Sequence, residues 1–299
     1  MIRRKDRPCA AYNDDVRVCE RRSYSGTGDP GKVRIPFGQS VLSAVASWYT
    51  IPVHRGMGRG IMIKTQIVTY KEGATDCEGF FAFDDAKPGK RPGILVVHEW
   101  NGNQSYMQQR SRMLAELGYV AFAPDIFGKG VRAQTMEECA KISEPYYKDR
   151  ALLRARAQAG LDQLRGHAGV DTAKIVAIGY CFGGMVVLEM ARAAMPVVGV
   201  VSFHGQFATP TPAKKITAKV LALHGAADPV VPPEEVAAFE KELTEAGADW
   251  QIVSYGGAKH TFTNYNLPKG IPGPAAYDEK ADKRSWIAMK EFFRETIDA

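Results

Sequence analysis

The sequence has 299 residues, of which 45% are hydrophobic and 24% charged, and its formal net charge is +6. These values indicate a soluble folded chain that can bury a large core as one α/β domain or two smaller ones. No apolar run approaches the roughly 18 residues that a membrane span needs, which excludes an integral membrane protein. The cysteines, five in number and never spaced as CxxC, argue against a disulfide framework or a zinc ribbon. We therefore expect a reducing, cytoplasmic location.

The excess of positive over negative charge lies in the first fifth of the chain. Residues 1–61 contain 11 lysines and arginines against 5 acidic residues, whereas residues 62–299 are balanced. A neutral body has no basic excess with which to release counterions from a phosphate backbone. We therefore expect neither a nucleic-acid nor a membrane partner, and a small molecule as the ligand.

Residues 1–61 are rich in Arg, Gly and Ser and show neither helical nor strand periodicity. Their apolar stretch, residues 41–53, begins too late for a signal peptide, and the acidic residues before it argue against a transit peptide. We expect residues 1–61 to be a disordered extension or a start-site artefact, with the body starting at Met62. Residues 62–299 should form a single α/β domain.

From residue 62 onwards, strand patterns alternate with helix patterns. Two β-prone runs joined by KEGATD predict a hairpin, and GILVVH is typical of a strand buried on both faces. The predicted strands are 63–70, 77–83, 93–98, 119–123, 174–180, 197–203, 219–224 and 250–255. The predicted helices are 104–117, a long region 135–165 bent at Pro145, 183–194, 234–246 and 282–297. This order predicts an α/β fold with a mostly parallel sheet of about eight strands and helices on both faces.

A cysteine occupies the switch from a predicted strand to a helix. The sequence GYCFGG places Cys181 where the nucleophile-elbow pattern G-x-S-x-G has serine. The glycines suit a tight turn, and the N-terminus of the following helix favours a thiolate. Taken alone, Cys181 fits a nucleophile and a buried space-filling cysteine equally well.

Two further strand ends carry polar residues that complete a pattern. Asp228 follows strand 219–224, and His260 lies in the loop after strand 250–255. The chain order of nucleophile, acid and histidine is that of α/β-hydrolase triads. A histidine near Cys181 can take its proton, and Asp228 can fix the imidazole's orientation. We predict that Cys181, Asp228 and His260 are catalytic.

A fourth strand end carries Glu99 and Trp100. In this architecture the loop after that strand supplies one oxyanion-hole amide, and the residue after the nucleophile supplies the other. We assign these backbone amides to Trp100 and Phe182, each worth roughly 2.7–4 kcal/mol in the transition state.

The remaining strand-end histidines have no carboxylate cluster beside them, so we predict no metal site and no cofactor. His98, His204 and His224 are interpreted as packing or supporting residues. His204, Phe262 and Asn264 are expected close to the substrate pocket.

These motifs resemble the dienelactone hydrolase family of α/β-hydrolases across essentially all of residues 62–299. The matching segments are VVHEWNG, GYVAFAPDIFG, GYCFGG, HGAADPVVP and KHTFTN. The resemblance implies an α/β-hydrolase fold and a Cys181–His260–Asp228 triad that opens lactones or cleaves small esters through an acyl-cysteine. It also implies that Glu99 contacts the resting cysteine and helps to generate its thiolate.

The sequence departs from this family at the substrate carboxylate. Members that act on dienelactone bind that group with arginines, one of them four residues after the histidine, where this chain has Asn264. No second arginine aligns in the long helical region, although Tyr146, Tyr147, Lys148 and Arg150 lie there. The substrate is therefore open.

Two other functions fit the same residues. One is a non-enzymatic or redox-sensing thiol protein on this fold, against which the presence of Asp228 and His260 argues. The other is a thioesterase, although the neutral body offers no docking surface for a large carrier. The chain is expected to be a monomer or a small homo-oligomer.

Overall fold

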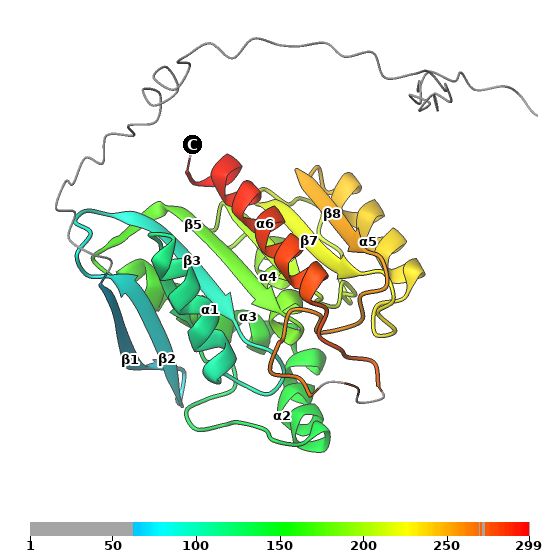
Figure 1. The fold of residues 1–299 in the computed structure, drawn as a ribbon, viewed down its shortest axis with the longest axis horizontal. Coiled ribbons are helices and arrows are strands. Elements are labelled where there is room, and N and C mark those ends of the chain that lie inside the picture. Colours follow the sequence, from blue (N-terminus) through cyan, green and yellow to red (C-terminus); the bar gives the residue numbers. More distant parts are fainter. Residues whose placement is uncertain (1–61, 269, 271–272, 299) are drawn as a thin grey trace, which may run out of the picture. The chain divides into compact units, whose positions relative to one another are not determined.

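Eight strands form one sheet in the order β1-β2-β4-β3-β5-β6-β7-β8 (Figure 1). The structure, a computed structural model, describes residues 62–268, 270 and 273–298, so the prediction for residues 1–61 lies outside it. β1 and β2 form an antiparallel hairpin, β2 pairs antiparallel with β4, and the other neighbours are parallel. The strands are β1 Ile63–Glu72, β2 Thr75–Asp84, β3 Arg91–Val97, β4 Val120–Ala123, β5 Val170–Tyr180, β6 Gly199–Phe203, β7 Lys219–Gly225 and β8 Trp250–Tyr255. The predicted fold class is confirmed.

Helices cover both faces of the sheet. They are α1 Ser105–Glu116, α2 Met136–Lys148, α3 Arg150–Gly166, α4 Phe182–Arg192, α5 Pro233–Glu245 and α6 Glu279–Thr296. One core cluster joins the sheet to α3, α4 and α5, and a second joins it to α1 and α6 (Figure 1). None of the helices in the described part of the chain is long and apolar enough to cross a membrane.

The central strands divide their side chains between these two cores. In β3, Leu95 and Val97 belong to the first cluster, while Ile94 and Val96 belong to the second, and all four are fully buried. Because successive side chains of a strand point to opposite faces, a strand covered on both sides must be apolar throughout. This explains the continuous GILVVH run from which the strand was predicted.

The long predicted helix is in fact two helices, and the break is not at Pro145. Pro145 lies inside α2, whereas the chain leaves helical geometry at Asp149, with φ −119° and ψ 95°. The Asp149 carboxylate accepts hydrogen bonds from the amides of Ala151 (2.9 Å) and Leu152 (3.0 Å) and so caps α3. Aspartate is a favourable N-cap because it satisfies amides that have no helical acceptor. The boundary between α2 and α3 therefore lies at the capping residue Asp149.

Other boundaries moved by a few residues where a cap or a pairing continued an element. The hairpin strands extend to Glu72 and Thr75, leaving only a two-residue turn with Gly73 at φ 54°. α6 begins before the predicted residue 282 because the Asp278 carboxylate accepts from the Ala281 amide at 3.0 Å.

The strand register brings the predicted functional positions to one edge of the sheet. Val97 of β3 pairs with Gly179 of β5, and Tyr180 pairs with Phe203 of β6. The residues that follow these strands therefore leave the sheet at the same level. Parallel α/β sheets place their reactive groups at this carboxyl edge.

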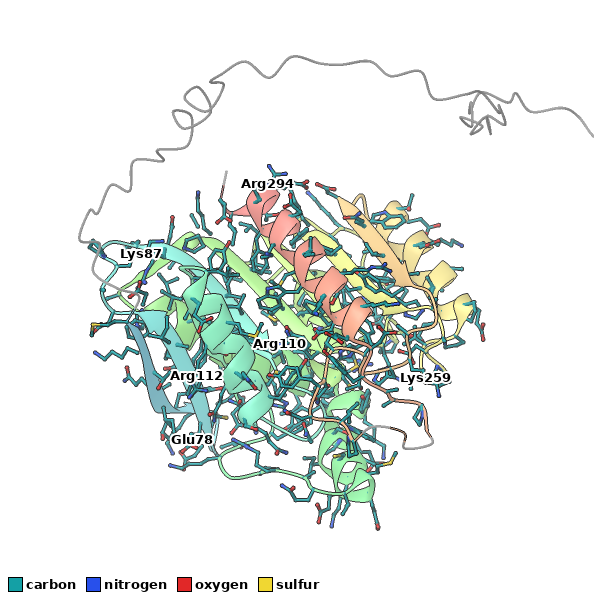
Figure 2. All side chains as sticks on the ribbon, in the orientation of Figure 1. Glu78, Lys87, Arg110, Arg112, Lys259 and Arg294 are labelled. Carbon is teal, nitrogen blue, oxygen red and sulfur yellow. The ribbon has the colours of Figure 1, made fainter. Side chains whose placement is uncertain are left out.

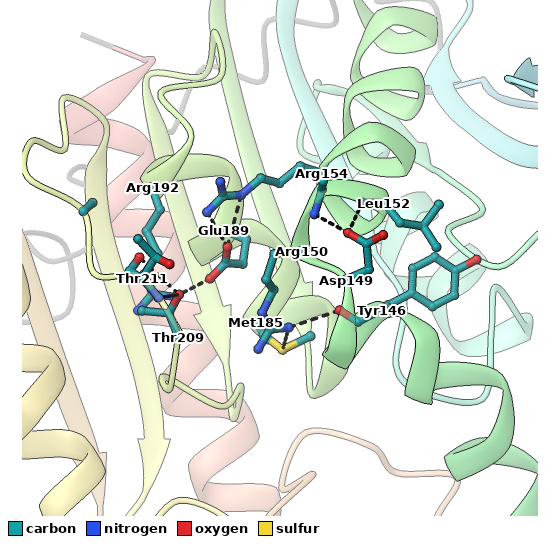
Figure 3. A network of polar contacts seen from close by, with 12 residues as sticks. Tyr146, Asp149, Arg150, Leu152, Arg154, Met185, Glu189, Arg192, Thr209 and Thr211 are labelled. Carbon is teal, nitrogen blue, oxygen red and sulfur yellow. Dashed lines mark hydrogen bonds and ion pairs between the residues drawn. The ribbon is translucent and has the colours of Figure 1, made fainter.

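Away from that edge, a buried ion network ties α3, α4 and α5 together (Figure 3). Arg192 Nη2 lies 2.7 Å from Glu242 Oε2, and Arg192 Nη1 lies 3.1 Å from Glu189 Oε1. Arg154 Nη2 reaches the other oxygen of Glu189 at 2.7 Å, but the Arg154 side chain is 33% exposed, against 1% for Arg192. Arg192 is therefore the cation on which two buried carboxylates depend.

Replacing Arg192 with Met should lower the free energy of unfolding by about 3–5 kcal/mol, because it leaves buried carboxylates without their partner. The matched change Arg154→Met, at a partly exposed cation, should cost only about 1 kcal/mol. Urea unfolding of the two variants measures both values. Equal losses would mean that Arg192 is no more important than its exposed neighbour.

Candidate active site

The turn from β5 into α4 holds Cys181 in a backbone conformation that residues with a side chain rarely adopt. Its φ is 54° and its ψ −114°, and α4 begins at the next residue. A Cβ on Gly179 would overlap the carbonyl of Gly183, and a Cβ on Gly183 would overlap the carbonyl of Val97. Glycine is needed at both positions because neighbouring backbone fills the space. The geometry is a strand–turn–helix elbow with cysteine at its apex.

The three predicted catalytic residues form one chain of hydrogen bonds. His260 Nε2 lies 3.1 Å from Cys181 Sγ, and His260 Nδ1 lies 2.7 Å from Asp228 Oδ2. The other Asp228 oxygen accepts from the amide of Val230 at 2.8 Å, which fixes the carboxylate. An imidazole held this way can take a proton from the thiol while the aspartate orients it. The structure thus brings together residues from three separate strand ends.

The surroundings of His260 favour its charged form. Burial opposes the charge, but the neighbouring Cys181 sulfur and the hydrogen bond to Asp228 outweigh it and raise the pKa of His260 to about 10. The backbone of His260 is fixed as well, since its amide donates to Pro274 O (3.2 Å) and its carbonyl accepts from Ala276 N (3.0 Å). The His260 ring is therefore both oriented and made a strong proton acceptor at the position next to Cys181.

Glu99 is a buried carboxyl at the same edge, and its hydrogen bond is made to the loop after His260. Glu99 Oε2 accepts a hydrogen bond from Asn264 Nδ2 at 2.6 Å, and among the described residues no hydrogen bond joins Glu99 to Cys181. Glu99 Oε1 is buried and has no hydrogen-bond partner among the described residues. Burial raises the pKa of Glu99 to about 7, against the opposing hydrogen bond from Asn264.

A cavity of about 1030 Å³ opens over these groups. Cys181, His260, Glu99 and Asn264 line it, together with residues of α2 and of the loop after His260. Of the three residues expected at the pocket, Asn264 therefore does line it. His204 and Phe262 do not line it, since both are fully buried. They lie behind the lining residues, with 5.6 Å between the ring centroids of His204 and His260 and 5.1 Å between those of His204 and Phe262.

The proposed oxyanion amides begin the two segments that flank the thiol. Phe182 is the first residue of α4, where helix geometry leaves an amide without an intrahelical acceptor. Trp100 lies in a turn closed by the bond from Gly102 N to Glu99 O (3.2 Å). Both residues line the cavity. Their role as oxyanion donors stays a prediction.

Two of the strand-end histidines support the structure around the site, His98 through hydrogen bonds to backbone and His224 through packing. His98 Nδ1 lies 2.7 Å from the carbonyl of Glu99, and His98 Nε2 accepts from the amide of Ile126 at 3.1 Å. Burial lowers the pKa of His98 to about 4, so the ring is neutral and holds the start of the loop after β3. The His224 ring packs against Phe207, with 5.8 Å between the centroids, and burial lowers its pKa also.

Sequence reasoning missed several residues around the site. The cavity wall includes Cys139 and Tyr147 of α2 and Gln206 after β6. Thr263, within the KHTFTN segment, is fully buried and hydrogen-bonded to His204. The position of Thr263 between His260 and Asn264 was a usable indication, whereas nothing local marked the α2 residues. Their approach to Cys181 is a tertiary contact.

The strand order, the elbow and the residues at the carboxyl edge define an α/β-hydrolase. A family model described as "Dienelactone hydrolase family" matches residues 78–297, and the chain belongs to that family. It is an enzyme of the hydrolase class, as the family and its curated relatives indicate.

Several similar proteins are hydrolases by name. A crystal structure described as a dienelactone hydrolase-like promiscuous phosphotriesterase from metagenomic libraries is 40% identical, with TM-score 0.74, over 78% of this chain and 98% of that one. A solved structure described as m3DLH is 36% identical, with TM-score 0.76, over 79% of this chain and 99% of that one. A Yersinia pestis protein named "Putative carboxymethylenebutenolidase" is 26% identical over 72% of this chain and 82% of its own length.

The raised pKa of Glu99 predicts a pH-dependent stability. Burial favours the protonated carboxyl, so its contribution to stability is fully present below the pKa of the unfolded chain and is lost as the pH rises through about 7. Glu99→Gln stays neutral and should therefore be more stable than the wild type at pH 8, on the order of 2–3 kcal/mol, with little difference at pH 4.5. Urea unfolding at both pH values measures this, and an equal difference at both would contradict it.

Proposed function

We propose that this chain hydrolyses small carboxylic esters or lactones through an acyl-cysteine intermediate. Cys181 Sγ attacks the carbonyl carbon, His260 takes the thiol proton and later passes it to the leaving alkoxide, and Asp228 holds the imidazole. A water molecule activated by His260 then releases the acid and restores the thiol. The observation that carries this proposal is the continuous Cys181–His260–Asp228 chain at the mouth of a cavity.

The developing negative charge needs amide donors near the sulfur. In this proposal the oxygen of the tetrahedral intermediate lies between the amides of Trp100 and Phe182. Both follow strand ends that the sheet register sets side by side, and the dipole of α4 points its positive end at the same place. Glu99 supports the site as a buried carboxyl close to His260, whose charge lowers the pKa of that carboxyl.

The cavity also suits substrates that are uncharged near the reacting carbonyl. Apart from His260, the cations among its described lining residues are Lys141 and Lys148, both exposed on α2. Lys148 is already paired with Glu144 at 2.6 Å. A substrate carboxylate beside Cys181 would lose its hydration and face Glu99 with no guanidinium to pair with. The relative described as a phosphotriesterase fits this reading, because a phosphotriester carries no charge.

Hydrolysis of p-nitrophenyl acetate by the full-length protein tests the reaction. Iodoacetamide should abolish turnover in step with the alkylation of Cys181, which is measured by mass mapping. Cys181→Ala should lower kcat at least 10³-fold because the covalent route is lost. Cys77→Ala, at a buried cysteine of β2 outside the cavity lining, is the matched control and should keep its turnover. Full activity of Cys181→Ala would end the proposal. Rapid labelling without turnover would favour the sensor function.

A pair of substrates of the same shape tests the charge preference. p-Nitrophenyl 4-methylpentanoate should exceed p-nitrophenyl hemisuccinate in kcat/KM by at least about tenfold, since a hydrogen bond to a charged group is worth roughly 1.5–3 kcal/mol. Asn264→Arg should narrow that ratio, whereas Asn264→Leu, which also breaks the bond to Glu99 but adds no charge, should not. Equal rates for the two esters in the wild type would exclude the charge preference while leaving the esterase intact.

A further inference from the structure

His204 lies at the centre of the carboxyl edge without touching the substrate cavity. It follows β6 with φ 42°, a region in which histidine is tolerated better than most side chains. Its amide donates to the carbonyl of Leu223 in β7 at 2.8 Å, which anchors its backbone. Its ring is fully buried, with 5.6 Å between the ring centroids of His204 and His260. None of the proposed reaction steps uses this ring.

Both nitrogens of the His204 ring bond to segments that carry reacting groups. The backbone amide of Cys181 donates to His204 Nδ1 at 3.1 Å, and shares that hydrogen with the carbonyl of Phe203 at 3.0 Å. His204 Nε2 lies 2.7 Å from Thr263 Oγ1, three residues after His260. An amide can only donate, so Nδ1 must be unprotonated, and a neutral ring then carries its hydrogen on Nε2. This tautomer donates to the threonine oxygen.

The surroundings keep the ring neutral. Burial lowers the pKa of His204 well below its usual value, and the positive charges of His260 and Arg110 lower it further. The other titratable ring near it is Tyr180 of β5, at 6.1 Å between centroids. A protonated ring would turn Nδ1 into a donor facing the donor of Cys181, and the bond would be lost.

Thr263 is also held by two residues of α1. Tyr106 Oη donates to the carbonyl of Thr263 at 2.9 Å, and Arg110 Nη2 reaches the same carbonyl at 2.9 Å. Arg110, in α1, is bound to Asp282 of α6 at 2.6 Å and is buried between the two helices (Figure 2). The loop that carries His260 is therefore fixed to α1 and α6 close to the hydrogen bond between Thr263 and His204.

We propose that His204 is a positioning residue that sets the separation of the Cys181 thiol and the His260 imidazole, acting only as the neutral ring protonated on Nε2. One nitrogen holds the backbone of the nucleophile and the other holds the loop of the histidine. This inference rests on the proposed function, because the distance that His204 sets matters for proton transfer between those two groups.

Thr263 offers a matched pair of variants in the full-length protein. Thr263→Val keeps the shape but removes the oxygen that accepts from His204 and that also lies 2.8 Å from Tyr106 Oη, whereas Thr263→Ser keeps that oxygen. Thr263→Val should lower kcat for p-nitrophenyl acetate about tenfold, the scale of one buried hydrogen bond, with KM within twofold. The rate of Cys181 alkylation by iodoacetamide should fall in parallel. Thr263→Ser should restore both to within twofold of the wild type.

Nitrogen-15 NMR of the imidazoles tests the tautomer directly in the unmodified sequence. The expected result is a His204 ring with hydrogen on Nε2 that does not titrate between pH 5 and pH 9. A ring with hydrogen on Nδ1, or one that titrates near pH 6.5, would overturn the inference. His204→Asn, whose side-chain oxygen can accept from the Cys181 amide at the same φ, should retain more activity than His204→Leu.

These measurements test the positioning role of His204 separately from the esterase reaction. Equal kinetics of Thr263→Val and Thr263→Ser, with normal esterase activity, would refute the positioning role alone. Absence of esterase activity in the wild type would refute the proposed function. In that case the NMR result and the difference in alkylation rate would still decide whether His204 sets the geometry of the thiol.

Discussion

The sharp turn at the end of β5 is the constraint around which the site is arranged. Cys181 has φ 54° because the chain must reverse from strand to helix within one residue, and the carbonyl of Val97 crosses close to Gly183. A non-glycine residue in such a conformation costs on the order of 1–3 kcal/mol. The same conformation places Cys181 at the cavity rather than inside the core. The core on both faces of β5 supplies the stability that tolerates it.

The two carboxyl groups at this edge differ in their environment and so in what they can do. Asp228 is hydrogen-bonded to His260 and to the amide of Val230, a setting that suits a residue which orients the imidazole. Glu99 is buried and accepts from one side-chain amide among the described residues, and burial raises its pKa to about 7. This difference between the two residues follows from local solvation and hydrogen bonding rather than from residue type, since both are carboxylic acids.

Local sequence patterns sufficed for most of the fold and for the three residues of the hydrogen-bonded chain. Apolar runs, glycine-rich turns and the residue that follows each strand are features of single segments, and the sheet brings their ends together. One prediction failed at Pro145, where a strong local rule was outweighed by the N-cap at Asp149. The complete burial of His204 and Phe262 was not predicted, because it depends on contacts between segments far apart in the sequence. The Glu99–Asn264 bond joins residues 165 positions apart, which no local pattern encodes.

Backbone strain is concentrated where the chemistry is proposed. Of the described non-glycine residues with positive φ, Cys181, His204 and Thr261 lie at or next to the hydrogen-bonded chain, and the fourth, Ala194, lies after α4. Strained residues persist only where their surroundings over-determine them. Here the over-determination is polar: a buried hydrogen-bonded path runs from Asp282 through Arg110, Thr263 and His204 to the Cys181 amide. A neutral histidine suits this path, because it accepts at one nitrogen and donates at the other without placing a second positive charge beside His260.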